Sequence, residues 1–593
     1  MKLARANRQR GAALLLLLAV LILGSSWYLV SRLNVESGLT DAARKARNTQ
    51  VLNKAKLALI GYVAAQAVKT GENNPGAMPC PENPADFDDA TGLQGRVGTS
   101  CGVTTVGRFP WKTLGLDQLV DASGEPLWYV VGPGWGVLSG SNTVINSDSL
   151  GQLTVDGAAN DSIALIIAPG PAFKAPAATG CTTWNQVRPA TGTPDWRNYL
   201  ECENATSPAD ATFVTFKSPI VDSVTKAVTP VFNDQVVKIT VADVMPAIEA
   251  AIANRIEREI VPALNTVYTP STWGFSGINP QYPYAAPFAN PGPGTGTSSY
   301  QGAAGTYAGL LPFFQTESCT PSAANPRCNT SLLVFSKSGS DTMISGGGSI
   351  RTQSTCSWVS TTYVCTGEYN DPTVSLIFRF RVTNVAMGLR ALDTSKVIVT
   401  AMNDTTGGWG TQTVASTTTA VLNTDGSATF TVTTGLMPDI GTAGWGTYAN
   451  YVISIDRAAV GDHVLLDATT ASTIGWFARN EWFRQTYYAV APAYITGNTA
   501  SLRLPPACTT GSTGIAANDC LTVSSVTPAS AQRAILILGG RSLNSTSRPS
   551  ATLANYLEAG NATSAYTRKT VSAATAIPVA QRFNDRIVVV GSN

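Results

Sequence analysis

Ten cysteines are the residues whose type and spacing indicate a definite chemistry. They form five couples whose members lie 21, 21, 9, 9 and 12 residues apart. An even number of cysteines without a Cys-x-x-Cys motif, in a chain with one histidine, favours disulfides over zinc and indicates an oxidising compartment; free buried thiols are the alternative. We therefore predict five local disulfides, which pair Cys80 with Cys101, Cys181 with Cys202, Cys319 with Cys328, Cys356 with Cys365, and Cys508 with Cys520.

Carboxylates and the histidine are the candidates for catalysis. Asp234 and Asp585 each follow Phe-Asn and precede a β-branched segment, which is more typical of a turn or a strand-start cap than of a catalytic group. His463 has no Gly-x-Ser-x-Gly partner motif, and the chain has no HExxH motif or P-loop. We therefore predict that the protein is not an enzyme, with no catalytic residue and no cofactor. A hydrolase with paired carboxylates needs no motif and stays a third alternative.

A cluster of acidic residues shortly after Cys80 is the candidate for a metal site. Asp86, Asp88 and Asp89 resemble part of a calcium loop, but their spacing and the lack of a bidentate Glu favour a solvated turn. We predict no metal site. The composition also bears on partners: charged residues make up 13% of the chain and the net charge is +2, so we expect no nucleic-acid binding.

The N-terminal stretch decides where these residues are placed. Residues 12–30 carry no charge and would form about 28 Å of helix, enough to cross a bilayer, after a basic segment that ends at Gly11. Three interpretations stay open: a cleaved signal peptide, a plain signal anchor, and a prepilin-type leader cut between Gly11 and Ala12. From 31 to 69 there is no proline, and small and apolar residues recur every three or four positions, which predicts an amphipathic continuation of the helix.

A membrane span fused to a long amphipathic helix, ahead of a domain with disulfides, resembles type IV pilins and the pseudopilins of type II secretion systems. The segments ALIGY, PCP, PWKTLGL and GEPLWYVV between 58 and 131 also resemble a group of large bacterial pilin-like proteins. Most pilins have Glu at the fifth mature position, where this chain has Leu16, so the resemblance is to minor or tip subunits. It implies an N-terminal helix that packs among other pilin or pseudopilin subunits, a prepilin peptidase, and contact with the inner membrane.

An internal repeat gives the best evidence of topology. WYVVGPGW, SIALIIAPG, NYLECENATS and VFNDQVVKIT occur between 128 and 240, and YYAVAPAY, RAILILGGR, NYLEAGNATS and RFNDRIVVV follow in the same order between 487 and 590. Two copies at this length indicate a domain duplication. Between them, Met245, Ile248, Ile252, Ile256 and Ile260 predict the apolar face of a helix.

The region between the copies changes in composition twice. Residues 269–329 are rich in Pro, Gly and aromatics, which predicts a long surface loop. Residues 330–475 alternate and are rich in Thr and Val, with a hairpin turn expected at Asp425-Gly426, which predicts an antiparallel sandwich. As an exposed insertion, the sandwich is a candidate adhesive surface, and a structural spacer is the alternative.

These observations predict an α+β fold with a long membrane-spanning N-terminal helix, a duplicated pilin-like head and an inserted antiparallel β-sandwich-like domain. The predicted function is a structural minor pilin or pseudopilin that initiates, primes or caps a type IV pilus or a type II secretion pseudopilus. The alternative is an anchored surface adhesin that enters no filament. The predicted location is a single pass of the inner membrane, with a periplasmic or extracellular head at the cell surface or pilus tip. The predicted domains are a leader at 1–11, the helix at 12–69, a first head at 70–268, the loop at 269–329, the insertion at 330–475 and a second copy at 476–593.

Overall fold

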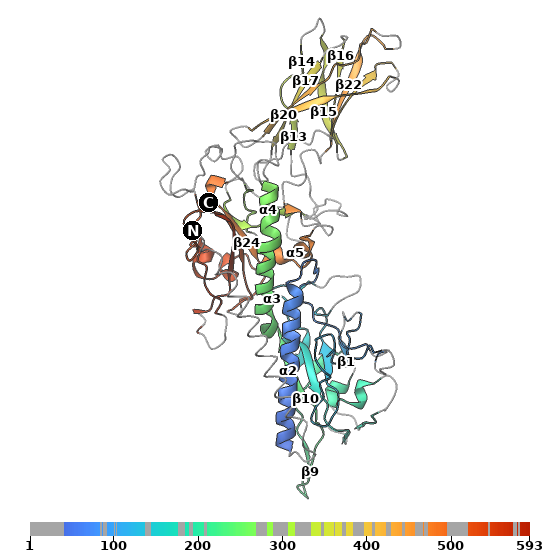
Figure 1. Ribbon diagram of the computed structural model, residues 1–593, viewed down its shortest axis with the longest axis vertical. Helices are drawn as coiled ribbons and strands as arrows, with labels where there is room; N and C mark the ends of the chain where they lie inside the picture. Colours follow the sequence, from blue (N-terminus) through green and yellow to red (C-terminus); the bar gives the residue numbers. More distant parts are fainter. Residues whose placement is uncertain are drawn as a thin grey trace, which may run out of the picture.

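The computed structural model describes most residues from 41 to 592. Within that range the longest stretches outside the description are 269–281, 289–305, 315–333, 384–395, 457–465 and 495–519, with shorter gaps between them. The described chain is mainly antiparallel sheet, and helices lie along its centre (Figure 1).

The first helix among the described residues is α2 (Asp41–Ala67), and it is amphipathic. Leu52, Ala55, Leu59 and Val63 recur at helical spacing, and each is at most 1% exposed. The opposite side carries exposed charged residues, including Arg44 and Lys45. The helix stops before the Gly- and Pro-containing segment that follows residue 70, as expected for residues that favour turns.

The prediction of a membrane-spanning helix has to be corrected. Across the part of the chain that the structure describes, no helix has the length and apolar character needed to cross a bilayer. Helix α2 lies within 31–69, where an amphipathic helix was predicted, and it has basic residues in its first two turns, which are costly inside hydrocarbon. Residues 12–30, on which the prediction rested, lie outside the described residues, as do Gly11 and Ala12. The fold class with a long membrane-spanning helix and the single-pass location are therefore not supported.

The first copy of the repeat forms a sheet against α2. Strands β1 (Thr105–Arg108), β2 (Trp128–Val131) and β4 (Ala158–Ala168) are neighbours in antiparallel pairs, and β10 (Gln235–Thr240) pairs with β4. β3 (Leu153–Val155) extends the sheet towards β7 (Thr212–Phe213). Ile166 lies in the core that contains α2, whereas Leu165 and Ile167 lie in a second cluster on the other face. Because both faces of the second half of β4 are covered, residues 163–168 are a continuous apolar run.

The second copy has the same arrangement. Its sheet has the order β11 (Ala308–Leu310), β24 (Thr486–Val490), β25 (Gln532–Leu538) and β26 (Arg586–Ser592), all antiparallel. These four strands correspond to β1, β2, β4 and β10. The helix against it consists of α3 (Val241–Arg255), a π-helical turn (Ile256–Ile260) and α4 (Val261–Tyr268). The five predicted apolar residues from Met245 to Ile260 are all fully buried.

Helix α3 begins at a capping box. The Thr240 side chain accepts a hydrogen bond from the Asp243 backbone amide, and the Asp243 carboxylate accepts one from the Thr240 amide. Lys56 of α2 also binds that carboxylate, with an Nζ to Oδ2 distance of 2.8 Å. Farther along, Arg258 donates to the Val68 carbonyl. The helices of the two copies therefore run side by side in the same direction, and one hydrophobic core includes residues from both copies.

The β-rich region is a separate sandwich with its own core. One sheet has the order β13 (Val334–Lys337), β17 (Ser375–Thr383), β21 (Ala428–Thr434) and β20 (Ser416–Leu422), with β14 (Thr342–Ile344) also on β17. The other has the order β15 (Ile350–Val359), β16 (Thr362–Tyr369), β22 (Ala449–Asp456), β18 (Val397–Asn403) and β19 (Gln412–Val414). Burial alternates along β22, as expected for a sheet with one covered face. β20 and β21 form the expected hairpin, whose turn at Asp425-Gly426 lies outside the described residues.

The sandwich is inserted within the second copy. It follows β11 and precedes β24, two neighbours in one sheet, and the chain leaves and returns beside the parallel pair β12 (Phe313–Phe314) and β23 (Leu466–Asp467). The sequence predicted an insertion between the two copies. The structure differs because the helix at 241–268 and strand β11, both before the sandwich, already belong to the second copy.

Short elements complete the described chain. They are the strand pairs β5 (Lys174–Ala175) with β6 (Trp184–Asn185) and β8 (Ile220–Val221) with β9 (Val228–Thr229), the helix α5 (Gly475–Arg479), and the 3-10 turns Trp196–Asn198, Cys202–Ala205, Trp482–Arg484, Pro492–Tyr494, Leu553–Asn555 and Ala559–Thr563.

Candidate functional site

The repeated YLE and FND motifs meet in space in the first copy. The YLE segment lies at a 3-10 turn, and the FND segment leads into β10. The Asp234 carboxylate accepts hydrogen bonds from the Glu201 amide at 3.1 Å and from Asn204 Nδ2 at 2.9 Å. In return, Glu201 Oε2 accepts from the amides of Asn233 and Asp234, at 2.9 and 3.0 Å. The two carboxylates therefore fasten the turn to the start of the strand.

The second copy repeats this geometry atom for atom. Asp585 Oδ2 accepts from the Glu558 amide and from Asn561 Nδ2, both at 2.9 Å. Glu558 Oε2 accepts from the amides of Asn584 and Asp585, at 3.0 and 3.1 Å. Each copy thus has one carboxylate pair with one Asn, and we call these the two carboxyl clamps: Glu201, Asn204 and Asp234 in the first copy, and Glu558, Asn561 and Asp585 in the second.

Burial governs the protonation of the carboxyl clamps. Asp234 and Asp585 are 6% and 1% exposed. Burial, and next the charge of the neighbouring Glu201, raises the pKa of Asp234 well above its usual range. Burial and Glu558 do the same to the pKa of Asp585. Two carboxylates in contact hold a shared proton readily, but these face backbone amides, so a structural role is favoured over a catalytic one.

A third buried carboxylate lies where the two copies meet. Glu249 of α3 is 2% exposed, and its Oε1 accepts from Ser147 Oγ of the first copy at 2.9 Å and from the Arg541 amide of the second at 2.7 Å. Ser147 Oγ also lies 3.3 Å from the Gly539 carbonyl oxygen, its other acceptor. Burial raises the pKa of Glu249 to about 7, against hydrogen bonds and arginines that lower it.

An ion pair and an indole fix the same junction farther along the helix. Arg255 is fully buried, pairs with Glu259 at 3.0 Å, and donates to the Glu72 carbonyl after α2. Its guanidinium lies 4.0 Å from the ring centroid of Trp476, whose Nε1 donates to Glu259 at 2.7 Å. These contacts connect the end of α2, the π-helical turn and α5.

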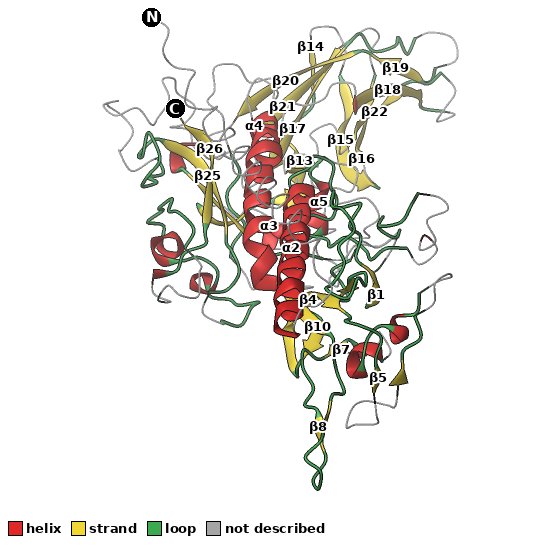
Figure 2. Ribbon diagram, turned by 60° about the horizontal axis from the view of Figure 1, so that its bottom comes forward, coloured by secondary structure: helices red, strands yellow, loops and turns green. Residues whose placement is uncertain are grey.

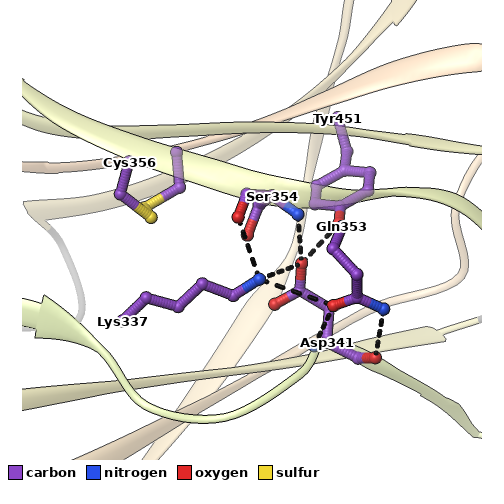
Figure 3. The surroundings of a disulfide bond; sticks show 7 residues. Lys337, Asp341, Gln353, Ser354, Cys356 and Tyr451 are labelled. Atoms are coloured by element: carbon purple, nitrogen blue, oxygen red, sulfur yellow. Dashed lines mark hydrogen bonds and ion pairs between the residues drawn. A yellow bond between two sulfur atoms is a disulfide. The ribbon is translucent and has the colours of Figure 1, made fainter.

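The sandwich has its own buried carboxylate. Figure 3 shows Asp341 among Lys337, Gln353, Ser354 and Tyr451, near Cys356. Asp341 Oδ2 accepts from Tyr451 Oη at 2.6 Å and from the Ser354 amide at 2.8 Å, and Lys337 Nζ lies 3.1 Å away. Burial and the bond to Asp341 raise the pKa of Tyr451. The cluster connects the two sheets, because Lys337 is on β13 and Tyr451 on β22.

The structure contains two of the predicted disulfides in full. Cys80 binds Cys101 in the first copy, with Cα atoms 5.5 Å apart, and Cys356 binds Cys365 across β15 and β16, with Cα atoms 4.0 Å apart. Cys202 and Cys520 are also disulfide-bonded. Their predicted partners, together with the Cys319 and Cys328 pair, lie outside the described residues.

The other predicted residues give no assembled site. Asp86 is described, whereas Asp88, Asp89 and His463 lie outside the described residues. In the part of the chain that the structure describes, no three His, Cys, Asp or Glu side chains are grouped as a metal site would require. Sequence reasoning singled out Asp234 and Asp585 but missed their partners Glu201 and Glu558. The signal was present, since both motifs recur in the repeat in the same order.

Comparison with known proteins adds no identification: no family model, curated protein or solved structure matches the chain. The assignment to type IV pilus or type II secretion families is therefore not supported by any match. The resemblance to pilins depends on the sequence segments alone.

Proposed function

We propose that this chain is a structural subunit that initiates, primes or caps a filament of the pilus type and displays the sandwich at its outer end. The observation that supports this best is the placement of its parts. The sandwich lies at one end of the long body, and the first turn of α2 points to the other (Figure 1). A subunit built into an assembly through one end and exposed at the other needs this arrangement.

The junction between the copies supports a mechanical role. One core runs through α2, α3 and both sheets, and Glu249 binds residues of both copies. Arg255 and Trp476 join α2 to α5 by way of the π-helical turn. Buried, hydrogen-bonded side chains of this kind fix the relative position of two domains more firmly than a surface contact would.

The chemistry of the buried carboxylates also favours a structural subunit. In both carboxyl clamps the acceptor oxygens are aimed at amides of the chain itself. Disulfides occur in proteins of oxidising compartments, where pilus-type filaments assemble. An adhesin that enters no filament is the competing proposal.

The test is to shear surface filaments from the source cells and to quantify peptides of this chain by mass spectrometry. The proposal expects the chain in the filament fraction at low stoichiometry relative to a major subunit. A Gly11→Ala variant, which blocks cleavage of a prepilin-type leader, is expected to leave the filament fraction.

The adhesin alternative gives the opposite pattern. An adhesin would be absent from sheared filaments, and Gly11→Ala would leave its amount at the cell surface unchanged. A Gly61→Ala variant is the matched control, because a Cβ at Gly61 in α2 meets no atom within 4 Å, so the variant should enter filaments as the unmodified chain does.

A further inference from the structure

A β-hairpin projects from the body at the end where α2 begins. Strands β8 and β9 pair only with each other among the described strands, and every residue from 218 to 230 is exposed. In two views the hairpin extends beyond the first turn of α2 (Figures 1 and 2). We call the hairpin and the first turns of α2 the hairpin pole.

The hairpin exposes apolar side chains on both of its strands and at its tip. The exposed fractions are 86% for Val224, 63% for Val228, 56% for Val221, 38% for Ile220 and 67% for Phe216 at the base. Apolar residues exposed singly are ordinary, but five of them lie on this one projecting hairpin and its base. A two-stranded hairpin without a core is only marginally stable in water, so a partner that covers these side chains would stabilise it.

Hydrogen bonds within the chain nevertheless fix the hairpin at its tip and at its base. Asp222 accepts hydrogen bonds from the amides of Val224 and Thr225, at 2.9 and 2.6 Å, which forms the tip. These bonds lower the pKa of Asp222, so the carboxylate is ionised and directed at its own turn. At the base, the Thr215 amide and hydroxyl donate to Asp156. The apolar tip is thus held out from the body.

Basic side chains surround the same pole. Gln235, just after the hairpin, donates to the Lys45 carbonyl and to Thr49 in α2, which brings the first turns of the helix next to the hairpin. Arg44 and Lys45 are exposed there, and Lys226 is exposed near the tip.

We infer that the hairpin pole is a lipid-binding surface, in which the hairpin tip enters the interfacial region of a bilayer and the basic side chains meet anionic headgroups. Apolar residues flanked by lysine and arginine are typical of interfacial membrane contacts. A bilayer also covers a thin hairpin from all sides, as these exposed side chains require, whereas a protein groove covers one face. The contact is made by strands at the surface and needs no spanning helix. It does not depend on the proposed filament role.

The test uses the full chain with vesicles of phosphatidylcholine, with and without phosphatidylglycerol. Val224→Asp with Val228→Asp is expected to lower partitioning onto anionic vesicles by about ten-fold or more, because it places two charges in the contact. Val421→Asp with Leu436→Asp is the matched control on the sandwich, where the side chains are 60% and 69% exposed, and it should partition as the unmodified chain does. Because all four positions are exposed, thermal unfolding should stay close to that of the unmodified chain.

Hydrogen exchange of the unmodified chain provides the second measurement. Anionic vesicles should slow the exchange of peptides that cover 216–229 and leave the sandwich strands unchanged. Equal partitioning of the hairpin variant and the control would overturn the inference. So would slow exchange at 216–229 that needs no lipid and increases with protein concentration, since this would identify a second copy of the chain as the partner.

Discussion

The buried carboxyl group of Glu249 makes the stability of the junction depend on pH. Burial raises its pKa from 4.5 to about 7 in the folded chain. A difference of that size corresponds to a free energy on the order of 3 kcal/mol. Because the folded state holds the proton more tightly than the unfolded state, this contribution is fully present below pH 4.5 and is lost as the pH rises to about 7.

A Glu249→Gln variant tests this directly. The Gln carbonyl can still accept from Ser147 and from the Arg541 amide, but it does not ionise. The free energy of unfolding of the variant, relative to that of the unmodified chain, should therefore increase by about 3 kcal/mol between pH 4 and pH 8. Taking this difference between two chains removes the contributions of the carboxyl clamps, which titrate in both.

The assay is urea unfolding of the oxidised chain at several pH values. Fluorescence of buried tryptophans such as Trp476 follows the shared core. Glu257→Gln, at an exposed position two turns farther along, is the matched control for the loss of an acidic residue from the same helical segment. A stability difference between Glu249→Gln and the unmodified chain that stays constant across the range would refute the reasoning.

Three further predictions concern stability. Asp585→Ala removes the acceptor of the Glu558 amide and of the buried Asn561 side chain. It should cost about 2–4 kcal/mol in urea unfolding, whereas a cost below about 0.5 kcal/mol would contradict the clamp. Replacing Cys356 and Cys365 by Ser opens a loop with a separation of 9 residues and should lower the stability of the sandwich by about 2–3 kcal/mol. In calorimetry, the unfolding transition of the duplicated body should stay unchanged. A shift of that transition would argue against an independent sandwich core. Trp476→Phe removes the indole donor to Glu259 and should cost about 1–3 kcal/mol by the same unfolding assay, and an unchanged midpoint would show that the bond contributes nothing.

Local sequence patterns predicted much of the fold. The apolar spacing from Met245 to Ile260 predicted a helix face, and alternation predicted the strands of the sandwich, because both patterns follow from the geometry of one element. The repeated motifs predicted a domain duplication, and the strands that they form have the same order in both sheets. What they missed is that the helix at 241–268 is the counterpart of α2. The two helices correspond by position against their sheets, which one sequence does not reveal.

The buried polar groups could not be predicted in the same way. Glu249 lies in a run of Ala and Ile, and a glutamate in an amphipathic helix is expected on the exposed side. Ser147 and Arg541 approach from the two copies and supply hydrogen bonds to its buried carboxyl group, which the local sequence does not reveal. The partners of Asp234 were likewise hidden, since Glu201 is 33 residues away and meets it through the tertiary fold.

The membrane-spanning helix shows the limit of a strong local signal. The apolar run at 12–30 predicted it, but no helix among the described residues could cross a bilayer, and the run itself lies outside them. Helix α2 lies within 31–69, where the sequence predicted an amphipathic helix. Its apolar face is matched to the sheet and to α3. Packing within the body therefore accounts for the amphipathic pattern of α2.

The most direct test of the proposed filament role is the N-terminal residue of the mature chain, isolated from its source cells and determined by mass spectrometry. The proposal predicts a chain that begins at Ala12, after cleavage at Gly11. A chain that begins at Met1, or at a residue beyond Ser26, would contradict assembly by the pilus route.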